Sequence, residues 1–284
     1  MRVDRITMLL GCLMGTLMTQ SANQPKMTDP QSFYTVKIET HNVAYELRIN
    51  DIPVLEQTDE ASGIISNFPI NPWLINGHNT FRIRILPVET STVDPDDTKS
   101  YSVVISGPQD QGMSDNPIAH AEAVVSDSHS DTPEEKSFTI ALPYPHPPWA
   151  ESKPIGKDAA TKKKILDKYR EFYRLLETRD LEGIMTFSDA KFKEYSKSLY
   201  RPDFSSDMRN SFSEEFSSPP GYLIGIDVQE ENGLTYEYYH GDRLVSVKND
   251  EGRSIIMYYN DEYGVTTSYS LFFYFDGEDF ILIL

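Results

Sequence analysis

A proline-rich stretch near the middle of the chain constrains the fold most. The sequence PYPHPPWAESKP, residues 143–154, holds five prolines. Proline lacks a backbone N–H and fixes φ, so this stretch can neither pair inside a sheet nor continue a helix. We therefore expect an extended, semi-rigid linker over residues 143–159, with one domain on each side of it.

Residues 30–142, before the linker, have the pattern of short strands. Apolar and polar residues alternate in segments such as Tyr45–Ile49 and Phe81–Ile85, as in half-buried strands. Asn50 and Asp51 predict a turn between two of these segments. The strands are expected at 33–38, 45–49, 52–55, 81–85, 101–105, 119–125 and 137–142. Regularly spaced short strands predict an all-β antiparallel sandwich. The Gly77-His78-Asn79 turn resembles one found in jelly-roll or immunoglobulin-like sandwich modules of bacterial surface and sugar-active proteins.

Residues 160–284, after the linker, combine helices with strands. Ile165, Tyr169, Phe172 and Leu176 fall on one face of a helix, and Asp180 predicts the start of a second, short helix. Apolar spacing predicts two more helices, near residues 192–199 and 208–216. From Tyr222 onward, strand segments are separated by turns containing glycine beside asparagine or aspartate. This order predicts an α+β domain with helices packed on a curved antiparallel sheet.

The helical segment ILDKYREFYRLLETRDLEGIMTF, residues 165–187, carries a second resemblance. Followed by shorter helices and a sheet, it resembles the nuclear transport factor two-like or SnoaL-like cone fold. The short strand that this family places between its helices is not evident, so a cystatin-like helix on a sheet is the alternative. Enzymes of that family carry a histidine or aspartate deep in the cone, whereas His240 falls in a predicted turn.

The N-terminus has the pattern of a secretory signal. Two arginines precede an apolar run from Ile6 to Met18, and a polar stretch begins at Thr19. The run is too short to span a bilayer. We predict a signal peptide over 1–22, cleaved near Ser21 or Ala22, and hence a periplasmic or secreted protein. In the alternative, Leu9-Leu10-Gly11-Cys12 resembles a lipobox, which would make the protein a membrane-anchored lipoprotein lipidated at Cys12.

Charge and composition limit the partners. The formal net charge is −18, which disfavours binding to nucleic acid or anionic lipid surfaces and favours a basic protein partner. Cys12 is the only cysteine, so its removal would leave no thiol for a disulfide or a metal. No pattern predicts a cofactor.

Three local patterns have the residue types of catalytic or metal-binding sites. Ser188 and Lys191 fit the Ser-x-x-Lys spacing of serine acyl enzymes, but the companion Lys-Thr-Gly is absent, so Ser188 is interpreted as a helix N-cap and Lys191 as solvated. The acidic segments 94–97 and 127–131 lack the glycine and terminal glutamate of a calcium loop and are interpreted as solvated turns. We predict neither a catalytic residue nor a metal ligand.

Aromatic residues crowd the predicted terminal sheet. Tyrosine buries area while keeping a polar tip, which suits a recognition surface. The candidate binding residues are therefore Tyr236, Tyr238, Tyr258, Tyr269, Tyr274 and Asp227. The sequence predicts a non-catalytic envelope protein that binds another protein, for example an immunity-type inhibitor of a toxin. The alternative is a cone-fold small-molecule carrier or an enzyme in which Asp227 acts as a base.

Overall fold

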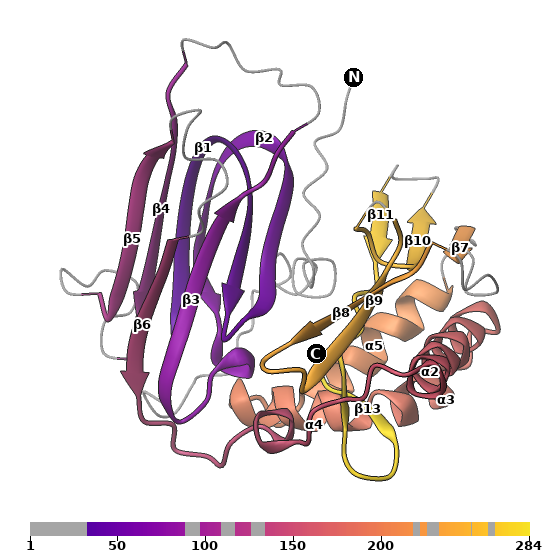
Figure 1. Cartoon of the computed structure of the whole chain (residues 1–284). Helices are drawn as coiled ribbons and strands as arrows, with labels where there is room; N and C mark the ends of the chain where they lie inside the picture. The colour runs from indigo at the N-terminus through magenta and orange to yellow at the C-terminus, as the bar shows by residue number, and fades with distance from the viewer. Residues whose placement is uncertain are drawn as a thin grey trace. The chain divides into compact units, whose positions relative to one another are not determined.

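The computed structural model describes residues 33–88, 97–108, 117–125, 134–217, 222–225, 233–250, 252–260 and 265–284. The predicted signal peptide, Cys12, Asp227, residues 94–96 and residues 127–131 lie outside them. Chain contacts divide the molecule into two compact units, one ending at Pro145 and the other beginning at His146. Together the units form a β-rich α+β fold with antiparallel sheets (Figure 1).

The N-terminal unit is built from six strands in one antiparallel sheet, in the order β5-β4-β1-β3-β6 with β2 paired to β1. The strands are β1 (Thr35–Ile49), β2 (Ile52–Pro69), β3 (Gly77–Ile85), β4 (Lys99–Ser106), β5 (Ala119–Val125) and β6 (Glu134–Ile140). The sheet curls: β5 and β6 approach each other, and Tyr101 on β4 donates a hydrogen bond to Glu134 on β6 (2.8 Å). The expected antiparallel strands are therefore present, but they form one continuous curled sheet.

Strand β1 causes this curl because it changes partner along its length. Thr35–His41 pairs with β4 and Tyr45–Ile49 pairs with β3, while β2 follows β1 on the other side throughout. The β1–β2 register shifts around Val43, and Asn42 has a φ of 55°. Such bulges bend a strand and increase its local twist. The predicted strands at 33–38 and 45–49 are thus the two halves of one bent strand.

A hairpin turn joins β1 to β2 as the sequence predicted. Asn50 and Asp51 have φ values of 51° and 67°, the left-handed conformations required at both central positions of a type I′ turn. Strand β2 then runs far beyond the predicted 52–55. The predicted 119–125 strand matches β5, and β6 begins at Glu134 rather than at Ser137.

The proline-rich segment is extended only in part. A short 3₁₀ helix, Pro148–Glu151, places Trp149 in the interior of the C-terminal unit, fully buried, with its ring edge-on to that of His240 (5.0 Å between centres). The Ile155 N–H donates to the Asp242 carbonyl (2.7 Å). Within the predicted linker, Trp149 and Ile155 are therefore buried in the C-terminal unit, because apolar side chains gain from burial.

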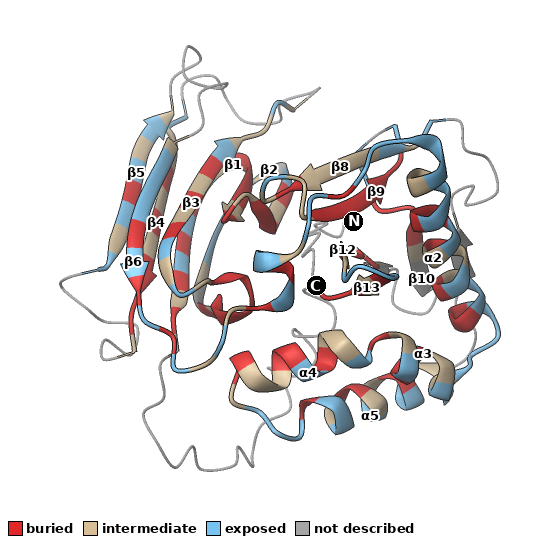
Figure 2. Cartoon of the chain, turned by 60° about the horizontal axis from the view of Figure 1, so that its bottom comes forward, coloured by how far each residue is buried: buried red, intermediate tan, exposed pale blue. Residues whose placement is uncertain are grey.

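The C-terminal unit begins with four helices: α2 (Ala159–Glu177), α3 (Leu181–Phe187), α4 (Asp189–Ser198) and α5 (Phe204–Ser217). The predicted stripe on the first helix is confirmed, since all its apolar members are buried while the opposite side is exposed (Figure 2). Asp158 caps α2 by accepting from the Thr161 N–H (2.9 Å), and Asp180 caps α3 in the same way with Gly183 (2.9 Å). No strand interrupts residues 159–217, as the sequence indicated.

Two small antiparallel sheets follow the helices. One has the order β11-β10-β7 and the other β13-β12-β9-β8. Their strands are β7 (Tyr222–Gly225), β8 (Thr235–Tyr239), β9 (Leu244–Lys248), β10 (Ile256–Asn260), β11 (Val265–Ser268), β12 (Phe273–Phe275) and β13 (Phe280–Leu282). The C-terminal run Phe280–Leu284 is almost entirely buried, and α2 and α4 lie against β13.

Candidate functional site

Two of the three tyrosines on β8, Tyr236 and Tyr238, lie against the segment at the start of α2. Tyr236 and Tyr238 alternate with the buried Tyr239 and are themselves half-buried. The Tyr236 hydroxyl donates to the Lys162 carbonyl (3.3 Å), and the Lys162 ammonium lies 5.2 Å from the ring centre. Lys157 lies over the Tyr238 ring at 4.7 Å. These two predicted binding residues thus pack against the unit's own chain.

The other predicted binding residues are separated from this pair. Tyr269 is buried against Phe172 and donates to Glu215 (2.9 Å). Tyr274, on β12, is half-buried; burial, followed by the charges of Asp276 and Glu194, raises the pKa of its hydroxyl. The Tyr258 side chain and Asp227 lie outside what the structure describes. The described members of the set do not form one exposed surface.

Aromatic rings fill the space between the helices and the terminal strands. Phe187 contacts Phe172 and Phe273, with ring centres 5.3 and 6.2 Å apart, and Tyr169 lies edge-on to Phe273 at 5.5 Å. The fully buried Tyr169 hydroxyl donates to the Leu271 carbonyl and accepts from the Val247 N–H, both at 2.8 Å. Here the polar tip is committed to the backbone, so this part of the interior is packed rather than open to a ligand.

Ser188 and Lys191 both lie at the start of α4. Ser188 occupies the N-cap position of α4 without a capping hydrogen bond from its side chain. Lys191 was expected in solvent but is half-buried, with its ammonium 5.7 Å from the Tyr195 ring centre; burial lowers its pKa to about 8. His240 lies in a backbone turn, and its ring packs against Trp149.

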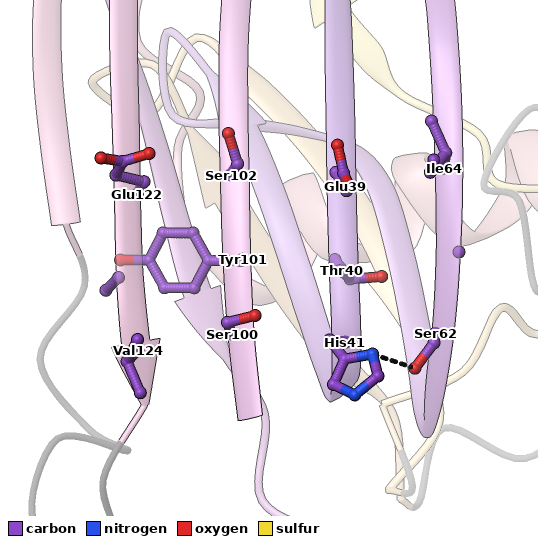
Figure 3. A pocket seen from close by; sticks show the side chains of 12 residues that line it. Glu39, Thr40, His41, Ser62, Ile64, Ser100, Tyr101, Ser102, Glu122 and Val124 are labelled. Carbon is purple, nitrogen blue, oxygen red and sulfur yellow. Dashed lines mark hydrogen bonds between the residues drawn. The ribbon is translucent and has the colours of Figure 1, made fainter. Parts of the chain in front are cut away.

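A groove of about 810 Å³ lies on the outer face of the N-terminal sheet, across β5, β4, β1 and β2 (Figure 3). Its floor is Ser100 and Ser102, the small outward side chains of β4. In the register of the ladder, His41 and Val124 flank Ser100, while Glu39 and Glu122 flank Ser102. The flanking residues on β1 and β5 form the two walls of the groove. Because β1 and β5 lie two strand spacings apart, roughly 10 Å, the groove is wide enough for one extended side chain or segment.

The groove is open and polar at its floor, with apolar side chains at its edges. Ile64 on β2, which pairs with Glu39 on β1, is 61% exposed, and Val124 on β5 is 73% exposed. The inward residues of the same strands, such as Ile38 and Val103, are buried. Alternation along each strand therefore separates a core face from a face that offers both hydrogen-bonding and apolar contacts to solvent.

His41 and Ser62 come together at one end of the groove, with the serine Oγ 3.1 Å from the imidazole Nδ1. A serine beside a histidine is the core of a nucleophilic site. Here, however, the Ser62 hydroxyl also bonds Asn42 Oδ1 (3.1 Å), and all these contacts are exposed. Among the described residues, no side chain hydrogen-bonds the other nitrogen of the His41 ring, so the pair lacks the third member of a triad there.

The described ranges hold neither a metal-binding cluster nor a membrane-spanning helix. There, no group of three or more histidine, cysteine, aspartate or glutamate side chains is placed to hold a metal ion. Asp97, the described member of the acidic 94–97 segment, is exposed. The same residues contain no helix long and apolar enough to cross a membrane.

Comparison with known proteins assigns this geometry to no established family: no family model matches the sequence, and no curated protein or solved structure matches the chain. The two fold resemblances therefore stay predictions.

Sequence reasoning missed the groove for an identifiable reason. Its residues come from four strands, and only the register places Glu39, Ser102 and Glu122 in one row. The sequence does contain one relevant pattern. One strand carries small serines at alternate positions, and other strands carry larger polar residues at alternate positions. The sequence does not reveal that β1 changes partner along its length. It therefore cannot show which strands are neighbours in the sheet.

Proposed function

We propose that this protein is a non-catalytic binding protein of the bacterial cell envelope and that it binds another protein. The observation that carries the proposal is the open groove on the β5-β4-β1-β2 face, which presents polar and apolar side chains side by side. Exposed surfaces of this mixed kind are typical of protein recognition. In this proposal the two compact units are separate domains, a β-sandwich-like binding domain and a cone-like α+β domain.

The alternative is a cone-fold small-molecule carrier or enzyme, which needs a concave pocket with converging polar groups. In the described part of the C-terminal unit, Tyr169, Phe172, Phe187 and Phe273 make ring contacts with one another between the helices and the terminal strands. This packing favours the binding protein. An immunity-type inhibitor is one example of the proposed class, by analogy of fold.

Site-specific photocrosslinking in the native bacterium tests the proposal. Ser102 is replaced by a photoreactive amino acid, and Thr139, exposed on β6, serves as the control position. We expect one discrete protein adduct from position 102 in the envelope fraction and none from position 139. The purified partner should then lose affinity for a Ser102→Trp variant, whose side chain fills the floor. Absence of a specific adduct at position 102 contradicts the proposal.

Export is tested by mass spectrometry of the mature N-terminus. We expect the chain to start near Ala22 or Asn23, without lipid. A lipidated Cys12 at the N-terminus would instead establish the lipoprotein alternative, and an intact Met1 terminus would contradict export.

A further inference from the structure

Two carboxylates face each other across the floor of the groove. Glu39 on β1 and Glu122 on β5 are both register partners of Ser102 on β4, and both are exposed. Among the described residues that line the groove, there is no lysine or arginine. The groove therefore concentrates negative charge at one level without supplying a cation of its own.

The neighbouring basic groups compensate this charge only weakly. Lys37 lies 3.2 Å from Glu39, and His120 lies 3.4 Å from Glu122, an interaction that is ionic only when the imidazole is protonated. Both groups belong to the next row of the sheet, outside the groove lining. Exposed pairs of this kind contribute little and exchange readily, so an incoming cation can share the carboxylates.

Apolar contacts are available on both sides of the acidic row. Ile64 lies beside Glu39, and Val124 lies two residues from Glu122 on β5. Along with Ile118, they are the exposed large hydrophobic side chains of the described chain. A ligand that complements this surface has to combine a positive charge with aliphatic groups over a span of several residues.

We propose that the groove binds an extended, basic segment of the partner protein, with a lysine or arginine side chain lying along β4. This inference rests on the proposed function. The aliphatic stem lies over Ser100, and the cationic head lies between Glu39 and Glu122, where Ser102 Oγ accepts a further hydrogen bond. Residues adjacent to the cation contact Ile64 and Val124. The net charge of −18 attracts such a segment before contact and raises its association rate.

The test uses defined peptides and the full-length protein. A fluorescein-labelled octapeptide of alternating lysine and valine is titrated at low ionic strength and followed by anisotropy, beside its glutamate–valine counterpart. The double variant Glu39→Gln/Glu122→Gln removes both charges but keeps the side-chain shape. Glu135→Gln/Glu278→Gln removes two charges at exposed positions outside the groove and is the matched control.

We expect the wild-type protein to bind the lysine peptide and not the glutamate peptide. The groove double variant should weaken binding about tenfold, and the control double variant by no more than about twofold, because only the groove carboxylates contact the cation. Circular dichroism should show all three proteins equally folded.

Two results would overturn the inference. Equal affinity of the wild type and the groove variant would show that the carboxylates do not bind the cation. Displacement of the peptide by spermidine at matched charge concentration would assign the groove to a free polyamine. Neither result bears on the photocrosslinking experiment. If a partner is captured at position 102 but binds the groove double variant with normal affinity, the basic-segment inference is wrong while the proposed function still holds.

Discussion

The two units use their polar side chains in opposite ways. In the C-terminal unit, the Tyr169 hydroxyl is wholly buried and bonded to backbone groups of two segments. In the groove of the N-terminal unit, Glu39, Glu122 and His41 point into solvent. Polar groups of the first kind stabilise a fold, since losing one partner leaves the other buried and unpaired. Those of the second kind contribute little to stability and remain available to a ligand.

Deleting Phe280–Leu284 should have the largest effect. Four of these side chains are buried, and each contributes roughly 1.5 to 3 kcal/mol, in sum comparable to the stability of a domain. We expect calorimetry to show loss of the cooperative transition of the C-terminal unit while the N-terminal transition remains. A truncated protein that melts like the full-length chain would show that this run contributes nothing to the core.

A buried ion pair on β1 tests whether the N-terminal unit also contains polar groups of the stabilising kind. Arg48 contacts both carboxylate oxygens of Glu46, at 2.7 and 3.1 Å, and the Glu46 side chain is only 4% exposed. Glu46→Gln should lower the free energy of unfolding by about 3 kcal/mol, because it removes a buried negative charge that both Arg48 and Arg84 contact and leaves Arg48 its pair with Asp51. Glu39→Gln, on the same strand and also paired two residues away, is the matched control and should change it by less than about 0.5 kcal/mol.

Tyr169→Phe should give a smaller but measurable loss. It removes a hydroxyl that donates to Leu271 and accepts from Val247, leaving both backbone groups buried without that partner. We expect about 1 to 3 kcal/mol lower stability by urea unfolding. Tyr173→Phe, half-buried on the same helix, should be nearly neutral; equal effects of the two substitutions would contradict the role given to the Tyr169 hydroxyl.

The smallest expected effect on stability is that of the groove itself. Val124→Ser replaces a side chain that is 73% exposed, so little buried area is lost. The melting temperature should shift by no more than a degree or two, while affinity for the captured partner falls several-fold. A large destabilisation would show that the groove edge belongs to the core.

Helices were predictable from the sequence, and sheet neighbours were not. The stripe through Ile165, Tyr169 and Phe172 specifies its buried face by local spacing alone, and Asp180 marks the next helix start. Strand pairing depends on residues far apart. The apolar positions change from even to odd numbers between Ile38 and Tyr45, but nothing in the sequence shows that β1 also changes partner there. For the same reason the tyrosines of β8 were predicted as a binding surface, whereas the Lys157–Lys162 segment packs over them.

The bulge in β1 also has a consequence for how the sequence of this unit can vary. Side chains alternate along a strand, so removing one residue from a regular β1 would turn Glu46 and Arg48 inward and Leu47 outward. A bulge absorbs an added or lost residue by shifting register locally. Insertions and deletions tolerated among homologues should therefore cluster between Thr40 and Tyr45. The part of β1 before the bulge, which lines the groove, and the part after it, which carries the ion pair, could then change in sequence independently.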